Sequence, residues 1–270
     1  MTQKSREQEI NEQEQRIKDR LAGIRNILIV MSGKGGVGKS TVAVNLAVGL
    51  AQSGFKTGLM DIDLHGPSTL KMLGLEDKSI SATADLLIPL SFNQELKVIS
   101  MASLLENPDT AVIWRGPLKI GAIKQFIADV LWEDLDYLII DSPPGTGDEP
   151  LTVAQVIPQA KSIIVTTPQQ VSILDIRKSI IFCRQTNMDV LGIIENMSGL
   201  TCPHCGEAID LFSFGGGEKT AEDMDVPFLG RIPIDPKIVT ACDQGKPFVL
   251  DPESADDGFN PIVERIVQET

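Results

Sequence analysis

Residues 27–41 read ILIVMSGKGGVGKST, and this stretch decides the fold. Five apolar residues at 27–31 predict a buried strand, and the apolar-rich segment 41–52 predicts a helix. Between them, GKGGVGKS fits the pattern G-x-x-x-x-G-K-[ST], whose glycines let successive backbone N–H groups face phosphate oxygens. The order of strand, loop and helix predicts a phosphate-binding loop for ATP, formed by Gly33, Lys34, Gly35, Gly36, Val37, Gly38, Lys39, Ser40 and Thr41.

Two side chains of this loop have roles that follow from nucleotide chemistry. Lys39 is predicted to contact the β- and γ-phosphates and to be needed for hydrolysis, and Ser40 is predicted to ligate Mg²⁺. The helix that begins near Lys39 also directs the positive end of its dipole at the phosphates. The stretch therefore predicts an ATPase.

The remainder of the chain alternates short apolar runs with amphipathic segments. The predicted strands are residues 27–31, 57–60, 97–100, 137–140, 162–166, 190–195 and 228–231, and predicted helices include 41–52, 117–131 and 173–186. Continuous apolar strands separated by helices predict an α/β fold: a doubly wound, mainly parallel sheet with helices on both faces, as in P-loop NTPases.

The domain organisation follows from composition. Residues 1–24 are rich in Gln, Glu, Lys and Arg, and we expect a polar, helical N-terminal extension that is solvated and frayed and lies on the domain. Residues 25–270 are predicted to form one domain that ends in a packed helix at 260–270. The irregular stretches 62–95, 142–151 and 198–217 each carry a candidate motif, as long loops in compact domains often do.

Charge and hydropathy exclude some function classes. Lys and Arg number 24 against 37 Asp and Glu, so the net charge is −13 and nucleic acid is not an expected partner. No apolar run is long enough to cross a bilayer, and the polar N-terminus has no hydrophobic signal core. We therefore expect a cytoplasmic protein without a membrane partner.

Carboxylates follow two further predicted strands, at the edge where ligands bind in parallel sheets. Asp61 and Asp63 come after strand 57–60, and we expect them to hold Mg²⁺-bound water and to orient the attacking water, with Asp63 in a catalytic role. A turn-capping pair is the alternative. Asp141 ends the run at 137–140 and is predicted to reach the Mg²⁺ shell. The following SPPGTGDE at 142–149 suits a switch loop that reports the γ-phosphate.

A pair of cysteines, Cys202 and Cys205, forms a C-x-x-C motif in the third irregular stretch. Two thiolates are half of a tetrahedral metal site, and a homodimer would supply four sulfurs by symmetry. A zinc knuckle and an iron–sulfur site both remain open, and the residues alone favour zinc; a thioredoxin-like pair is disfavoured because the motif does not open an early helix. Cys183 is predicted to be a buried small hydrophobe, and Cys242 has no assigned role.

The chain resembles the Mrp/ApbC family of iron–sulfur cluster carrier ATPases from about residue 25 onward. The segments that carry the resemblance are MSGKGGVGKST, DIDLHGPS, IIDSPPGTGDEPL, IENMSGLTCPHCGE, FGGGEKTAED and VPFLGRIPIDPKI. Lys34 also resembles the early lysine of the deviant Walker A signature in MinD, ParA and nitrogenase iron proteins. That resemblance implies a homodimer with ATP between the subunits, in which Lys34 crosses to the partner's nucleotide.

The family further implies a labile [4Fe–4S] cluster that bridges the dimer through Cys202 and Cys205. The cluster is handed to apo iron–sulfur proteins, with ATP binding and slow hydrolysis controlling the process. Asn196 matches an adenine-contacting residue of the family, and residues 231–235 match a loop beside the base. The alternative is a MinD/ParA-like positioning or regulatory ATPase with structural zinc at the C-x-x-C. A nitrogenase-like reductase is disfavoured, because its cluster cysteines come singly from separated loops.

Overall fold

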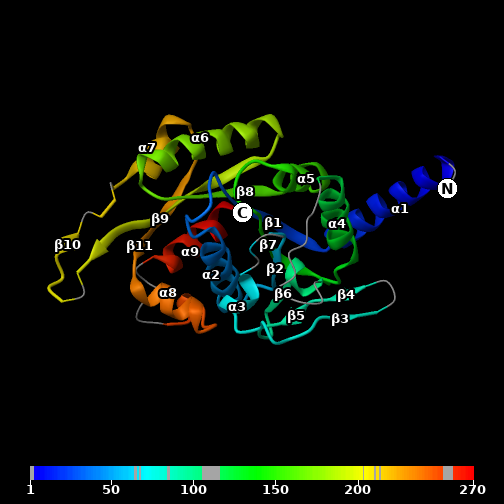
Figure 1. Cartoon of the computed structure of the whole chain (residues 1–270), viewed down its shortest axis with the longest axis horizontal. Coiled ribbons are helices and arrows are strands. Elements are labelled where there is room, and N and C mark those ends of the chain that lie inside the picture. The colour runs from blue at the N-terminus through cyan, green and yellow to red at the C-terminus, as the bar shows by residue number, and fades with distance from the viewer. Residues whose placement is uncertain are drawn as a thin grey trace.

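A nine-stranded sheet runs through the centre of the described molecule (Figure 1). The structure, a computed structural model, describes residues 3–63, 66, 68–83, 86–104, 116–202, 204–209, 211–212, 214–251 and 258–270. The strands of this sheet are β1 (Ile24–Ser32), β2 (Thr57–Asp61), β5 (Leu90–Ser91), β6 (Leu96–Ser100), β7 (Leu135–Asp141), β8 (Lys161–Thr166), β9 (Asp189–Thr201), β10 (Ala208–Ile209) and β11 (Phe228–Ile234).

The strand order is β10-β9-β8-β1-β7-β2-β6-β5, and β11 also pairs with β9. All neighbours are parallel except the short strands β5 and β10, which pair antiparallel with β6 and β9. The predicted doubly wound, mainly parallel sheet is therefore confirmed. A separate two-stranded hairpin joins β3 (Ser81–Ala82) to β4 (Leu87–Ile88).

Helices cover both faces of the sheet (Figure 1). They are α1 (Gln3–Leu21), α2 (Lys39–Gln52), α3 (Thr69–Met72), α4 (Gly116–Asp129), α5 (Asp148–Val156), α6 (Gln170–Gln185), α7 (Gly216–Asp223), α8 (Pro236–Asp243) and α9 (Phe259–Glu269), with single 3-10 turns at Met101–Leu104 and Phe248–Leu250. Within the described residues, none of these helices is both long and apolar enough to cross a bilayer.

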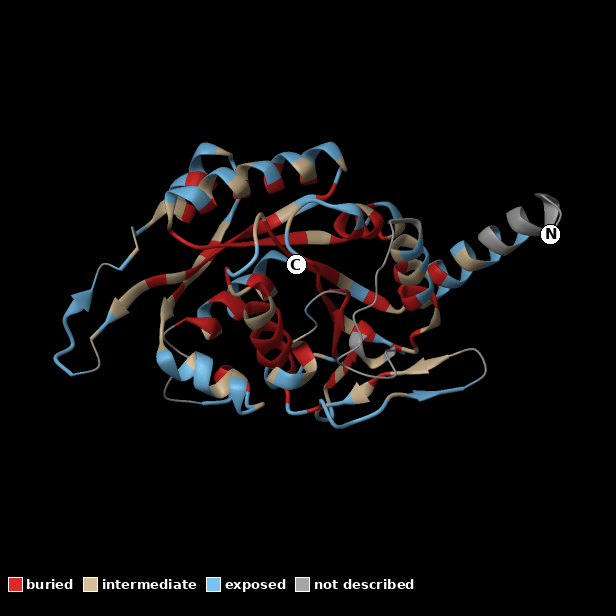
Figure 2. Cartoon of the chain, in the orientation of Figure 1, coloured by how far each residue is buried: buried red, intermediate tan, exposed pale blue. Residues whose placement is uncertain are grey.

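The continuous apolar runs of the strands produce two hydrophobic cores, one on each face (Figure 2). Side chains alternate along a strand. In β1, Leu28 and Val30 therefore pack with α2 and α9, whereas Ile27, Ile29 and Met31 pack with α4, α5 and α6. Because the parallel strands are buried on both faces, the position of each strand end in the sheet is fixed. The candidate site lies just beyond those ends.

The main difference from the sequence prediction concerns residues 198–217. The strand predicted at 190–195 continues to Thr201 and pairs antiparallel with β10, so the cysteine motif lies in a hairpin rather than in an open loop. In Figure 1 this hairpin projects from the end of the molecule opposite α1. The predicted loop 62–95 contains α3 and β3–β5, and 142–151 contains the start of α5; parts of 62–95 and 198–217 lie outside the described residues.

The first and last elements of the described chain are both helices. On α1, Ile17 and Leu21 are buried in the same core as α4, and Arg16 pairs with Asp129. The C-terminal half of α1 is therefore packed, not only solvated as its composition suggested. Helix α9 buries Phe259, Ile262, Val263 and Ile266, as expected for a packed terminal helix.

Candidate nucleotide and cysteine site

The phosphate loop connects the end of β1 to the start of α2, as predicted. Its left-handed residues include Gly38, which precedes the helix at φ 80°, a conformation that disfavours residues with a Cβ. A Cβ at Gly38 would also lie 2.2 Å from Nδ2 of Asn196. At the other end, a Cβ on Gly33 would lie 2.6 Å from the backbone of Asp175, so the loop begins directly against α6.

Lys39 and Asp141 form a buried ion pair at the carboxyl ends of the strands. Lys39 Nζ also donates to Ser40 Oγ at 3.1 Å. Burial raises the pKa of Asp141, and the charge of Lys39 opposes that rise. The structure thus brings together three residues that the sequence placed around the phosphates.

These residues fit a magnesium ion. Asp141 Oδ2 is buried and has no hydrogen-bond partner within the described part of the chain. Beside it, the Ser40 hydroxyl supplies a second oxygen donor, and Mg²⁺ prefers oxygen ligands. A buried carboxylate oxygen without a partner is costly, so a cation at this position would satisfy it.

Asp61 and Asp63 have different surroundings. Asp61 is fully buried: its Oδ1 accepts from the Asp63 N–H at 2.9 Å, and its Oδ2 accepts from the hydroxyls of Thr69 (2.8 Å) and Ser100 (3.1 Å). Burial, together with the charge of Asp141, raises the pKa of Asp61 to about 7. Asp61 therefore holds the turn that presents Asp63, whose Oδ1 accepts from the Gly66 N–H at 3.3 Å.

Asn196, on β9, contacts the phosphate loop directly. Its Nδ2 donates to the Val37 carbonyl at 2.8 Å. The resemblance assigned this side chain to adenine, and that role stays a prediction. The contact shows that β9 and the phosphate loop are joined by a side chain, which the sequence did not indicate.

The two cysteines lie in the turn of the β9–β10 hairpin. The turn is closed by hydrogen bonds from the Cys202 N–H to the Glu207 carbonyl (2.8 Å) and from the Gly206 N–H to the Cys202 carbonyl (2.9 Å). Cys205 is exposed and Cys202 is partly exposed. The backbone N–H groups of His204 and Cys205, with the Cys205 side chain, lower the pKa of the Cys202 thiol. A lowered pKa favours the thiolate, the form that binds metals.

Comparison with known proteins places the chain in a family. It matches the ParA family described as NUBPL iron-transfer P-loop NTPase over residues 23–269. The chain belongs to this family. Among its relatives, the iron-sulfur cluster carrier protein of Methanocaldococcus jannaschii is 49% identical over 95% of this chain and 89% of its own length. Cytosolic Fe-S cluster assembly factor NUBP2 of Gallus gallus is 46% identical over 93% of this chain and 94% of its own length.

Solved structures agree with this P-loop NTPase assignment. A nucleotide-binding protein from Archaeoglobus fulgidus, solved in complex with ADP, is 39% identical with a TM-score of 0.79, covering 90% of this chain and 96% of that chain. The cell division ATPase MinD of Pyrococcus furiosus has a TM-score of 0.66 at 23% identity, over 91% of this chain and 99% of that chain. The second likeness is one of fold alone.

Three features of this NTPase were missed by sequence reasoning. Burial raises the pKa of the Cys242 thiol, a residue left unassigned, and the Thr41 side chain opposes that rise. Glu149, at the start of α5, pairs with Lys119 of α4 at 2.9 Å. Glu195, at 0% exposure, accepts hydrogen bonds from three other residues. The signal for Glu195 was a charged residue at the end of an otherwise apolar run. Cys183 is buried, as predicted.

Proposed function

We propose that this protein is an iron–sulfur cluster carrier that binds a labile [4Fe–4S] cluster as cargo between two copies of the chain and transfers it to apoproteins. ATP binding and slow hydrolysis control the transfer. The observation that carries the proposal is the solvent-accessible pair Cys202 and Cys205 on a projecting hairpin, in a member of an iron-transfer NTPase family. The names of the two relatives above support a carrier and not a positioning ATPase.

The number of thiolates supports a homodimer. A [4Fe–4S] cluster takes four cysteine ligands, and one hairpin offers two. Within the described residues, no group of three or more His, Cys, Asp or Glu side chains is arranged to hold a metal ion. A two-fold axis beside the hairpin would bring two pairs together.

An exposed apolar surface beside the phosphate loop also supports a homodimer. Val171 and Leu174, in the first turns of α6, are 67% and 65% exposed. The same helix contacts the start of the phosphate loop through Asp175. Exposed apolar side chains grouped at one place favour a protein interface, and this interface would place Lys34 against the partner's nucleotide.

Nucleotide chemistry follows from the ion pair described above. When phosphates enter the loop, Lys39 exchanges its contact with Asp141 for contacts to the β- and γ-phosphate oxygens. Ser40 and Asp141 are the residues that would hold Mg²⁺, which supplies neutralisation of phosphate charge. Asp63, positioned by Asp61, orients the attacking water.

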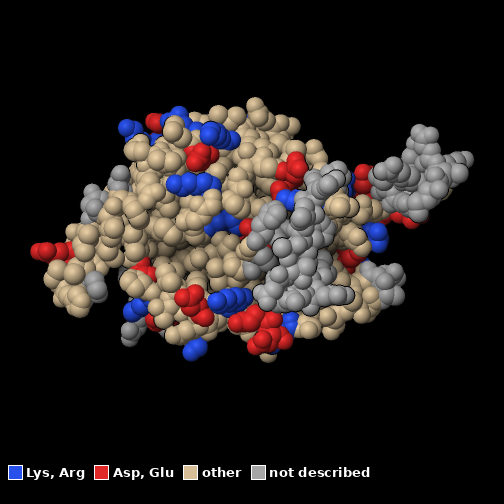
Figure 3. All heavy atoms as spheres, viewed as in Figure 1, with Lys and Arg blue, Asp and Glu red and all other residues tan. Residues whose placement is uncertain are grey.

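The proposed partners are apo iron–sulfur proteins in the cytoplasm. The net charge of −13 opposes nucleic acid, and acidic and basic side chains are interspersed on the face shown in Figure 3. Relatives named as cytosolic assembly factors support the location. We propose no membrane partner.

Anaerobic reconstitution tests the cargo. We expect one [4Fe–4S] cluster per dimer, measured as iron, sulfide and visible absorption, and transfer to an apo-enzyme whose activity returns only with a cluster. Cys202→Ala and Cys205→Ala each remove two of four ligands per dimer by symmetry and should abolish cluster binding. Cys183→Ala, outside the pair, is the matched control and should keep the cluster.

Two results would contradict the proposal. Stoichiometric zinc that iron and sulfide do not replace would support the alternative, a structural zinc site. A cluster that forms but never reaches the apo-enzyme would leave the metal assignment standing and refute delivery.

A further inference from the structure

A buried ion pair lies behind the cysteine hairpin, between Glu195 of β9 and Arg231 of β11. Glu195 is fully buried, and its Oε1 lies 3.5 Å from Arg231 Nε. A carboxylate is costly to bury unless partners surround it. Neither the nucleotide chemistry nor the cysteine ligation proposed above uses this carboxylate, so its contacts are the guide to its role.

The Glu195 carboxylate joins three segments. Oε1 accepts from the Ser198 hydroxyl and from the Gly215 N–H, and Oε2 accepts from the Gly217 N–H. Ser198 lies four residues before Cys202, whereas Gly215 and Gly217 lie at the start of α7. One side chain thus ties the base of the hairpin to α7 and to β11.

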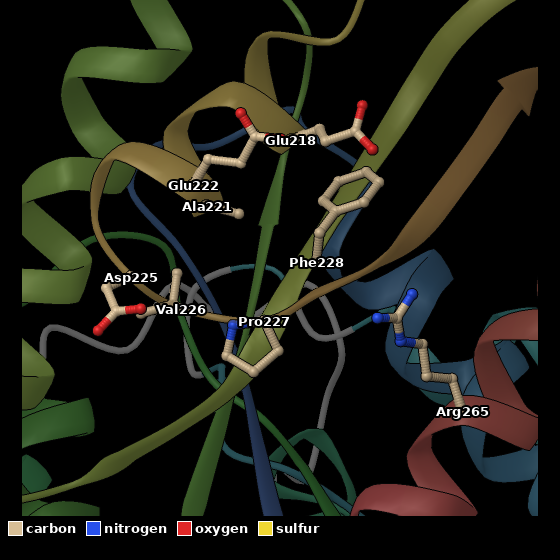
Figure 4. Close-up of a pocket in the computed structure, with 8 residues that line it drawn as sticks. All are labelled: Glu218, Ala221, Glu222, Asp225, Val226, Pro227, Phe228 and Arg265. Atoms are coloured by element: carbon tan, nitrogen blue, oxygen red, sulfur yellow. The ribbon is translucent and has the colours of Figure 1, made fainter.

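Arg231 holds this carboxylate in a fixed place. Its guanidinium also pairs with Glu218 of α7 and lies 4.5 Å from the ring centre of Phe214 and 5.1 Å from that of Phe228. Figure 4 shows Glu218 and Phe228 next to each other, on α7 and β11, at the edge of a groove of about 440 Å³. A planar cation held by two rings and two carboxylates has little freedom to move.

The strand β9 contacts the phosphate loop through the very next residue. Asn196 donates to the Val37 carbonyl, and successive side chains on a strand point to opposite faces. The strand is therefore held by the phosphate loop on one face and by the Glu195 carboxylate on the other. Any displacement of the phosphate loop would therefore be passed to β9 beside this fixed point.

The backbone between these contacts and the cysteines is unusual. Met197 has φ 55° and Gly199 has φ 80°, both left-handed. A methionine in this region is uncommon and costs energy, and such residues gather in segments that change conformation for function. The kink lies between the phosphate-loop contact of Asn196 and the cysteine turn, where a change in direction would move the thiols.

We infer that Glu195 is a positioning residue that transmits the nucleotide state of the phosphate loop to Cys202 and Cys205. The carboxylate anchors Ser198, so movement of Asn196 with the phosphate loop changes the direction in which the hairpin leaves the sheet. The purpose of this coupling, control of cluster release, rests on the proposed function. The coupling itself is a property of the metal-free protein.

The test measures how fast the two thiols react. Metal-free full-length protein is treated with iodoacetamide without nucleotide, with Mg·ADP and with a non-hydrolysable Mg·ATP analogue, and mass spectrometry follows Cys202 and Cys205 separately from Cys242. We expect nucleotide to change their alkylation rates about five-fold or more in the wild type. In Glu195→Gln the ratio of the alkylation rates with and without nucleotide should fall toward one, while the affinity for ADP is kept.

Two further variants make the test specific. Arg177→Gln breaks the Arg177–Asp223 pair near the far end of α7 and leaves β9 untouched, so it should keep the wild-type ratio. Ser198→Ala removes only the link between the hairpin and the carboxylate and should lower the ratio even if Glu195→Gln does not fold. An unchanged ratio in either folded β9 variant, or no nucleotide effect in the wild type, overturns the inference.

The experiment separates this inference from the proposed function. A protein that forms and delivers a cluster but keeps its alkylation ratio in Glu195→Gln refutes the inference alone. A ratio that depends on Glu195, in a protein that never binds a cluster, supports the inference and refutes cluster carriage.

Discussion

At the scale of single residues, the site contains one buried ion pair and, beside it, a second buried carboxylate. Lys39 and Asp141 are both buried, and each would be costly to bury alone. Asp61 lies beside Asp141 in the register of β2 and β7, with both of its own oxygens hydrogen-bonded. Substitutions of these residues should therefore affect nucleotide binding, ATP hydrolysis and folding stability to different extents.

The first prediction distinguishes binding from hydrolysis. Asp63→Ala should keep nucleotide affinity and lower kcat, because orientation of water matters only in the reaction. Lys39→Ala, the comparison variant, should abolish hydrolysis since it removes the cation expected at the phosphates. Calorimetric ADP binding and steady-state ATPase assays check both variants. Loss of ADP binding in Asp63→Ala, with an unchanged rate per bound ATP, would show that Asp63 binds rather than orients.

The second prediction concerns pH. Asp61 has a pKa of about 7 in the folded protein and an ordinary value of 3.8, so between these pH values the folded state holds a proton that the unfolded state has lost. The free energy of unfolding therefore falls as pH rises through this window. Asp61→Asn has no such proton, and its stability relative to the wild type should rise by on the order of 3 kcal/mol from pH 4 to pH 7.5.

Urea unfolding of the nucleotide-free protein in chelator, at several pH values, measures this difference. Groups that do not interact with Asp61 titrate alike in both proteins and cancel in the comparison, whereas Asp141, which interacts with it, contributes to the difference. A difference that stays constant across the window would mean that Asp61 is already ionised at low pH in the folded state.

At the scale of elements, two segments differ from the sequence predictions. The cysteine motif lies in a hairpin rather than in an open loop, and the C-terminal half of α1 is packed rather than only solvated. The phosphate loop and the strand ends were predictable, because glycine spacing and apolar runs are local signals. The continuation of β9 through Ser198 and Gly199 was not, because these residues read as loop formers and only pairing with β10 and β11 makes them a strand. Glu195 and Arg231 are far apart in sequence, so no local sequence pattern predicts their contact.

The third prediction tests whether α1 is part of the folded domain. Ile17 is buried against α4, so Ile17→Ala should lower the free energy of unfolding by about 2 kcal/mol or more. Arg16→Gln breaks only a partly exposed ion pair with Asp129 and should cost under about 1 kcal/mol. Denaturant unfolding of both variants measures these changes. Equally small decreases in the free energy of unfolding for both variants would mean that α1 is not part of the folded domain.

At the scale of the whole molecule, the proposed function requires two copies. The exposed apolar residues Val171 and Leu174 lie on α6, the helix whose Asp175 contacts the start of the phosphate loop. The cysteine pair lies at the tip of a hairpin at one end of the molecule (Figure 1). Because each phosphate loop and each cysteine pair is half of a proposed shared site, association and function should be lost together.

The fourth prediction follows from that surface. Val171→Glu and Leu174→Glu should weaken the ATP-dependent dimer by at least ten-fold, because burying an unpaired carboxylate costs more than about 1.4 kcal/mol. Val239→Glu on α8, at a similarly exposed position, is the control and should leave the dimer intact. Sedimentation velocity with and without a non-hydrolysable ATP analogue measures association. Dimers that survive both α6 substitutions would place the interface elsewhere.

The hairpin that carries the cysteines also has a consequence for how such proteins diversify. In the described part of the hairpin, the outer strand forms the residue pairs Ala208–Thr201 and Ile209–Leu200, and Ala208 and Ile209 are both exposed. Among the described residues of 199–212, none belongs to either hydrophobic core. Substitutions at exposed positions of this hairpin other than the two cysteines should therefore cost little folding stability, unlike those in the buried strands. Under the proposed function, these are the positions at which the shape and charge of the hairpin could be matched to a recipient protein without altering the nucleotide site.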